Sequence, residues 1–157
     1  MLSQQNNIHK NYNQNYDKQL RKVPEHKPLE LPKEYVRAAE EVMIKLGKYN
    51  EKTGTYFFKI TTSKIRSFLS LSNDIYNIEI RSKDENLTEE SINKLNRMRV
   101  RILYEAGRYE EVKAFVENSK IISYIKGIGT SRKKFLDFAQ YLEALVAYHR
   151  FLGGKSL

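Results

Sequence analysis

The sequence predicts an all-α protein, a compact bundle of about five helices that follows a flexible N-terminal tail. Apolar residues recur at three- and four-residue spacing through most of residues 34–157, which is typical of helices that bury one face. The connections between these stretches are short, as in antiparallel bundles. The chain has 157 residues, of which 40% are hydrophobic. This is enough for one domain with a core of its own.

Residues 1–33 are predicted to be a flexible polar tail, and residues 34–157 to be the helical bundle domain. Nine of the first twenty residues are Asn or Gln, and three prolines follow them, a composition that does not sustain a helix. Two Tyr-Lys groups in this tail could contact RNA, namely Lys10, Tyr12, Tyr16 and Lys18. A mobile extension that orders on assembly is the favoured interpretation.

The first two helices are separated by a turn. The first is expected over residues 35–46, where apolar residues keep a helical period and Gly47 supplies a stop. Thr53-Gly54 beside an aromatic run indicates a loop or a short hairpin. The second helix is expected to start near Thr61 and to bury a face that includes Ile65 and Phe68.

Three further helices complete the predicted bundle. The third begins at Thr88, has acids in its first turn, where they suit the helix dipole, and runs to Gly107. The fourth is expected to span roughly residues 110–124. The last begins near Thr130, is amphipathic, and ends on Gly153-Gly154.

The charge balance favours an anionic partner. The net charge is +9, from 28 Lys and Arg against 19 Asp and Glu, and the excess extends beyond the first 33 residues. Such a chain attracts phosphate polymers or anionic lipid. There is no cysteine, which excludes disulfides and thiolate metal sites. The N-terminus has no apolar signal core and no stretch reaches membrane-spanning length, so a cytoplasmic location without membrane contact is expected.

A stripe of positively charged side chains on the third helix is the main candidate binding surface. On a helical wheel, Lys94, Arg97, Arg101 and Arg108 fall within an arc of about 60° opposite the apolar face. Glu105 is the only acid between them. A stripe of this kind can follow a phosphate backbone, and a solvated charged face is the alternative.

Two other residues of the helices have mainly structural interpretations. Arg99 falls inside the apolar arc of the third helix, so it either pairs with a buried carboxylate, for which Glu143 is a candidate, or extends toward a partner. His149 lies near the apolar face of the last helix, where a hydrogen-bonded core histidine is the usual explanation.

Two predicted helix starts carry cations where the helix dipole opposes them. The second helix starts with hydroxyls followed by Lys64 and Arg66, and the last starts with hydroxyls followed by Arg132, Lys133 and Lys134. Hydroxyls, backbone amides and cations together make an anion site. These starts therefore favour phosphate binding.

A second hypothesis comes from the turn Gly127-Ile128-Gly129. A Gly-apolar-Gly turn between helices resembles the helix-hairpin-helix motif, which grips a DNA phosphate with its turn amides. Lys133 stands where that motif has a small residue, and a plain helix cap is the commoner explanation. A stand-alone DNA-binding protein of this type is therefore the alternative function.

An enzymatic function is not expected. The three histidines lack metal-ligand spacing, no glycine loop for a phosphate precedes a strand, and the acids form no evident pair. No catalytic residue, metal site or cofactor is predicted.

Three segments in order carry a resemblance to a known family. They are Thr61–Arg66, Leu103–Arg108, and Glu143–Arg150 with the two glycines that follow. Over about residues 35–154, the chain resembles the small subunit of the type III-A CRISPR effector, the Csm complex.

The resemblance implies a non-catalytic all-α subunit of an antiviral complex. It implies several copies that stack as a filament, that lie beside the other Csm subunits, and that contact the CRISPR RNA and target RNA without reading sequence. On this basis the expected RNA-binding residues are Lys59, Lys64, Arg66, Lys94, Arg97, Arg101, Arg108, Arg132, Lys133 and Lys134.

Overall fold

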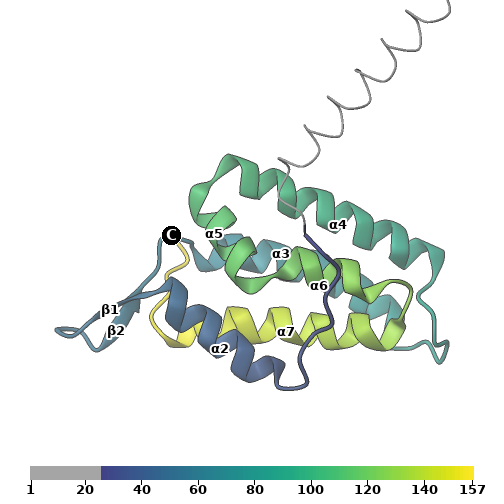
Figure 1. The fold of residues 1–157 in the computed structure, drawn as a ribbon, viewed down its shortest axis with the longest axis horizontal. Helices are drawn as coiled ribbons and strands as arrows, with labels where there is room; N and C mark the ends of the chain where they lie inside the picture. The colour runs from purple at the N-terminus through teal and green to yellow at the C-terminus, as the bar shows by residue number, and fades with distance from the viewer. Residues whose placement is uncertain (1–25) are drawn as a thin grey trace, which may run out of the picture.

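A computed structural model describes residues 26–157 of the chain, and it confirms the all-α prediction. Within this range there are six helices and one two-stranded hairpin (Figure 1). In chain order the elements are α2 (Tyr35–Leu46), β1 (Lys48–Asn50), β2 (Thr55–Phe57), α3 (Thr62–Glu79), α4 (Glu89–Arg108), α5 (Glu110–Ser119), α6 (Ile121–Ile128) and α7 (Arg132–Phe151). The predicted RNA contacts of Lys10, Tyr12, Tyr16 and Lys18 lie outside the described residues.

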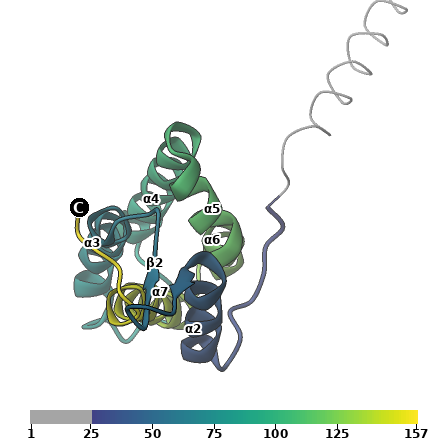
Figure 2. The ribbon, with the colours of Figure 1, turned by 90° about the vertical axis from the view of Figure 1, so that its left-hand side faces the viewer.

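The last helix, α7, organises the bundle. It packs against α2 and α3, while α4 lies on the far side of α3 and contacts α5 (Figures 1 and 2). Large aromatic side chains fill the core, among them Phe68, Phe115 and Phe138. Tyr141 is also buried, and its hydroxyl donates to the Ser119 carbonyl at 2.8 Å. Burial raises the pKa of Tyr141, so this hydroxyl stays a donor.

The prediction of one helix over residues 110–124 is wrong. The chain breaks into α5 and α6 at Lys120, which adopts a left-handed conformation with φ 57°. The break satisfies the end of α5, because the Lys120 amide donates to the Val116 carbonyl. Since a left-handed residue is usually Gly or Asn, a lysine gives no local signal of a helix end.

The short hairpin is confirmed. β1 and β2 pair antiparallel, with Tyr49 opposite Tyr56, and Gly54 takes φ 68° in the turn. The Tyr56 amide donates to the Leu152 carbonyl at 2.8 Å. The hairpin is thereby fastened to the segment that follows α7.

The prediction that His149 is a hydrogen-bonded core residue is confirmed. Its ring is fully buried, with Nε2 2.9 Å from the Ile60 carbonyl oxygen and Nδ1 3.1 Å from the Thr62 hydroxyl. Gly154 passes so close to the ring that a Cβ atom there would overlap it. Gly153, with φ 121°, turns the chain toward this crossing.

Residues 26–33, the described part of the predicted tail, lie along the bundle as an extended strap. The Leu29 amide donates to the Ser123 carbonyl at 3.0 Å, and Lys126 donates to the His26 carbonyl at 2.8 Å. Gly127 lets the strap approach α6, because a Cβ atom there would overlap the Leu29 carbonyl. The domain boundary at residue 33 stays a prediction.

Candidate nucleic-acid interface

The principal candidate is a basic groove between α3 and α4. Lys94, Arg97 and Arg101 line it from α4, at a helical spacing that points them in one direction. From α3, Ser67, Leu71 and Asp74 complete a hollow of about 540 Å³. Three cations therefore face one acid across a groove that is open to solvent. Hereafter this is the α3–α4 groove.

The ion pairs along α4 leave this charge largely available. Lys94 lies 3.7 Å from Glu90, and Arg101 lies 3.5 Å from Glu105. Such pairs within one exposed helix contribute only about 0.3–0.5 kcal/mol each. Arg97 forms no ion pair with any residue in 26–157. A phosphate can therefore bind here without breaking strong internal contacts.

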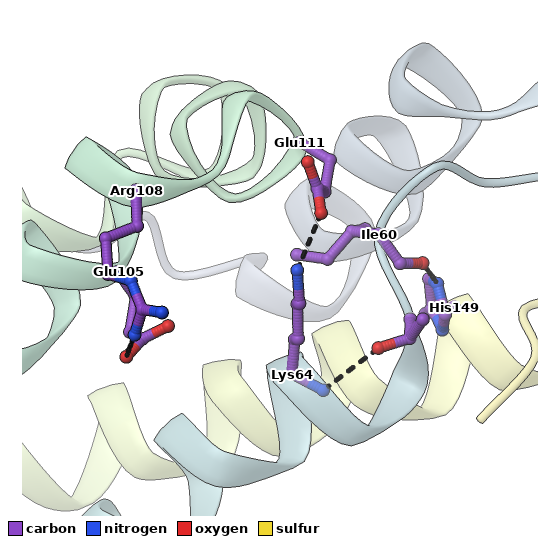
Figure 3. A network of polar contacts seen from close by, with 7 residues as sticks. Ile60, Lys64, Glu105, Arg108, Glu111 and His149 are labelled. Atoms are coloured by element: carbon purple, nitrogen blue, oxygen red, sulfur yellow. Dashed lines mark hydrogen bonds and ion pairs between the residues drawn. The ribbon is translucent and has the colours of Figure 1, made fainter. Parts of the chain in front are cut away.

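A second group of predicted residues meets near the end of α4. The Lys64 ammonium lies 3.5 Å from the centre of the Tyr109 ring, and the Arg108 guanidinium lies 5.0 Å from the same centre. Figure 3 shows the Lys64 side chain directed at Glu111, to which it donates at 2.6 Å. This hydrogen bond lowers the pKa of Glu111. Sequence reasoning missed Tyr109 and Glu111 because nothing local connects them to Lys64.

Arg108 and Lys59 lie around this group. Arg108 is 3.9 Å from Glu105 (Figure 3), and Arg101 lies 3.5 Å from the same carboxylate. Lys59 is exposed in the segment before α3, and its charge contributes to the lowered pKa of Glu111. The cations here are balanced by carboxylates more closely than those of the α3–α4 groove.

Arg132 is held by the fold. Its Nε donates to the Glu79 carbonyl at 2.7 Å, and its backbone amide donates to the Glu85 carbonyl at 3.0 Å. It therefore caps the end of α3 and ties α7 to the α3–α4 connection. Its partners lie far away in sequence, so the motif at the start of α7 could not reveal them.

The neighbouring lysines also have partners. Lys133 donates to Asp137 at 2.8 Å, which raises the lysine pKa. Lys134 donates to Glu30 of the strap at 2.8 Å, which lowers the pKa of that carboxyl. These carboxylates offset the unfavourable position of the lysines in the first turn of α7.

The two predicted anion-binding helix starts are largely occupied by the chain. At α3, the Thr62 amide donates to the Lys155 backbone carbonyl, and the Lys64 amide donates to the Thr61 hydroxyl. At α7, the Lys134 amide likewise donates to the Ser131 hydroxyl. Arg66 is exposed on α3 but does not line the α3–α4 groove.

The glycine turn before α7 is packed against another segment. The Leu87 amide donates to the Thr130 carbonyl at 2.8 Å, and the Ser131 amide donates to the Ile128 carbonyl at 3.0 Å. Gly127 lies within α6 against the strap, and Gly129 takes φ 56°. Gly127 thus permits the close approach of the strap, and Gly129 permits the turn before α7.

The suggested pairing of Arg99 with Glu143 is wrong. Arg99 is half-buried on α4, whereas Glu143 is exposed on α7, and no ion pair joins them. Both lie on the helices expected, but α4 is at the top of the bundle and α7 at the bottom (Figure 2).

Residues 26–157 hold neither a cluster of metal ligands nor a membrane-spanning helix. No three His, Asp or Glu side chains there come together as a metal site would require. No helix in that range combines the length and apolar character needed to cross a membrane.

Comparison with known proteins places the chain in a family. A family described as Csm2 type III-A matches residues 40–155. The chain is 40% identical over 121 residues to the CRISPR system Cms protein Csm2 of Streptococcus thermophilus, covering 77% of this chain and 93% of the relative. It is 36% identical over 122 residues to the protein of the same name from Mycobacterium tuberculosis, covering 78% and 94%. The chain therefore belongs to the Csm2 family of type III-A CRISPR systems.

Proposed function

We propose that this protein is the non-catalytic small subunit of a type III-A CRISPR interference complex in the cytoplasm. In this role, several copies stack beside the other Csm subunits and contact the backbone of the CRISPR RNA and target RNA. No cofactor takes part. Family membership supports the place in the complex, and the α3–α4 groove supports the contact with RNA.

The observation that carries the RNA contact is the arrangement of Lys94, Arg97 and Arg101 in one groove. Arginine matches a phosphate with two parallel hydrogen bonds, so Arg97 and Arg101 suit contacts to a phosphate backbone, and Lys94 adds a third positive charge beside them. Phosphate contacts position a strand and carry no sequence information. In an RNA-guided complex this is sufficient, because base pairing between guide and target selects the sequence.

The other predicted residues fall into different roles in this proposal. Lys64 and Arg108 make a secondary contact beside Tyr109, while Lys59 and Arg66 add long-range attraction from exposed positions. Arg132, Lys133 and Lys134 hold the start of α7 and contribute less to RNA.

The test is charge reversal of Arg97 and Arg101 in the assembled complex. Arg97→Glu with Arg101→Glu is expected to weaken target RNA retention by about tenfold or more, because two phosphate contacts become repulsive. Filter binding with labelled target RNA measures the change, and circular dichroism checks that helicity is kept.

The matched control is Lys45→Glu at the end of α2 with Lys48→Glu at the start of β1. Both lysines are exposed, so the control makes the same change in net charge away from the groove. Unchanged retention in the groove variant, or an equal loss in both variants, contradicts the assignment of this site.

A further inference from the structure

A cavity of about 430 Å³ lies between the strap and the helices that it crosses. Figure 1 shows the strap running past α6 and α7 before α2 begins. The strap forms one wall, α6 and the first turns of α7 form the others, and Tyr35 of α2 also lines the space. Its volume lies within the range of ligand pockets, about 300–1,000 Å³. We call it the strap cavity, and it shares no lining residue with the α3–α4 groove.

Hydrogen bonds to α6 and α7 hold the strap over this cavity. The Leu29 amide donates to the Ser123 carbonyl at 3.0 Å, and the Lys134 ammonium donates to the Glu30 carboxylate at 2.8 Å. Glu30 and Lys134 are 104 positions apart in the chain, so only the folded protein brings these walls together. The cavity is therefore part of the tertiary structure, as a pre-formed ligand site is.

Apolar side chains make up much of the lining. Phe138 of α7 and Ile128 of α6 are buried at the cavity, and Tyr124 and Leu31 line it from half-buried positions. Aromatic and aliphatic walls of this kind suit a flat ring. Stacking of a base on an aromatic side chain is favourable for every base. The lining therefore suits the ring system of a base without choosing among bases.

The charged side chains of the cavity leave one positive charge uncompensated. Lys133 pairs with Asp137 at 2.8 Å, and Lys134 pairs with Glu30 at 2.8 Å. Lys33 also lines the cavity, and it forms no ion pair among the residues that the structure describes. An ammonium beside a phosphate gains a charge-assisted hydrogen bond. The site therefore favours a ligand with one anionic group.

The two paired carboxylates can also hold a sugar. An ionised carboxylate has about four lone-pair sites, and Asp137 and Glu30 each accept one hydrogen bond from a lysine. Further lone pairs are thus available for ligand hydroxyls. Apolar walls, hydroxyl acceptors and one free cation together match the base, the ribose and the phosphate of a nucleotide.

We propose that the strap cavity is a binding site for a nucleoside monophosphate. The base lies against Tyr124 and Phe138, the ribose hydroxyls donate to Glu30 or Asp137, and the phosphate accepts from Lys33. Since the strap supplies Lys33 and α7 supplies Phe138, a bound nucleotide joins the strap to the bundle. This site is separate from the proposed RNA contact and does not depend on it.

The test is isothermal titration calorimetry of the full chain with three ligands at low ionic strength. The ligands are adenosine 5′-monophosphate (AMP), adenosine and inorganic phosphate. AMP is expected to bind at least tenfold more tightly than either of the others. Adenosine lacks the group that Lys33 binds, and phosphate lacks the ring and the sugar.

A charge reversal in the strap locates the phosphate. Lys33→Glu is expected to weaken AMP binding by about tenfold or more, because a carboxylate then meets the phosphate. The matched control is Lys27→Glu, which makes the same change in net charge within the same strap. Lys27 is exposed and does not line the cavity, so this variant should bind AMP as the wild type does.

A second variant moves the strap. The methyl group of Gly127→Ala would overlap the Leu29 carbonyl, so the strap must leave its place and the cavity loses a wall. Gly127 lies within α6, where alanine favours the helix, and circular dichroism should show unchanged helicity. AMP binding is expected to be lost.

Several results would overturn the inference. They are the absence of AMP binding, adenosine or phosphate binding as tightly as AMP, equal losses in Lys33→Glu and Lys27→Glu, and wild-type affinity in Gly127→Ala. Loss of AMP binding in Arg97→Glu with Arg101→Glu would also overturn it, because the nucleotide would then lie in the α3–α4 groove. Retention of target RNA by the complex tests the proposed function separately, so the two can fail independently.

Discussion

His149 shows how burial determines the state of a single residue. The Ile60 carbonyl can only accept, so Nε2 carries the proton and Nδ1 accepts from the Thr62 hydroxyl. The Phe58 ring lies 4.6 Å from the imidazole centre. Desolvation is the main reason that the pKa of His149 is lowered, and Arg150 adds repulsion. The folded state therefore holds His149 in its neutral form.

Stability should fall as the pH drops below about 6.5, the ordinary pKa of histidine. Below that pH the unfolded chain binds a proton at His149 that the folded chain does not bind. The contribution of neutral His149 to the free energy of unfolding is therefore complete above that pH and declines below it. Urea unfolding between pH 5 and 7.5 measures this. His149→Gln should remove most of the slope in this range and lower stability by about 1–3 kcal/mol. If His149→Gln keeps the wild-type dependence of stability on pH, groups other than His149 cause that dependence.

The cations of the candidate site separate into those that sequence could place and those that it could not. The arc of Lys94, Arg97 and Arg101 depends only on helical period, which is local, and all three line one groove. Arg132 looks similar in sequence, yet it caps α3 through the Glu79 carbonyl. Its role depends on a tertiary contact, so no local pattern could have revealed it.

The same distinction holds for whole elements. Helices α2, α3 and α4 have apolar periods, and their predicted starts agree with the structure. Two of these starts also have a side-chain cap; Thr88, for example, caps α4 by accepting from the Ser91 amide. The division at Lys120 was missed because a left-handed lysine gives no local signal. Burial of Ser119 and Ile121 on either side offsets its strain. The strap was missed because its contacts lie on α6 and α7.

Two glycines near helix ends should respond oppositely to alanine. Gly154→Ala is expected to lower the free energy of unfolding by about 2 kcal/mol or more, because the new methyl group overlaps the His149 ring. Gly107→Ala should raise it by about 0.5–1 kcal/mol, because the site is helical and open. Chemical denaturation of both variants measures the difference. Equal changes in stability for the two variants would contradict the close contact between Gly154 and the His149 ring.

For the molecule as a whole, the net charge of +9 sets the expected affinity for nucleic acid. The isolated chain should bind single-stranded RNA weakly, with affinity falling as salt rises. Three groove cations predict a log–log slope of about −2, at about −0.7 per phosphate. Titration at several salt concentrations measures it, with duplex RNA and duplex DNA of equal length as comparisons. Preference for duplex DNA would favour the helix-hairpin-helix alternative, and binding without salt dependence would contradict the electrostatic contact.

The segment that follows α7 has a consequence for how the protein folds. The Lys155 carbonyl accepts from the Thr62 amide, the Ser156 carbonyl accepts from the Ser63 hydroxyl, and Leu152 holds the hairpin. The start of α3 and the hairpin are therefore completed by residues more than 90 positions later in the chain. Since α7 also supplies the main packing surface for α2 and α3, these early elements cannot complete their packing before α7 is in place. Closure over so long a stretch of chain should make this bundle fold more slowly than a bundle built from local contacts.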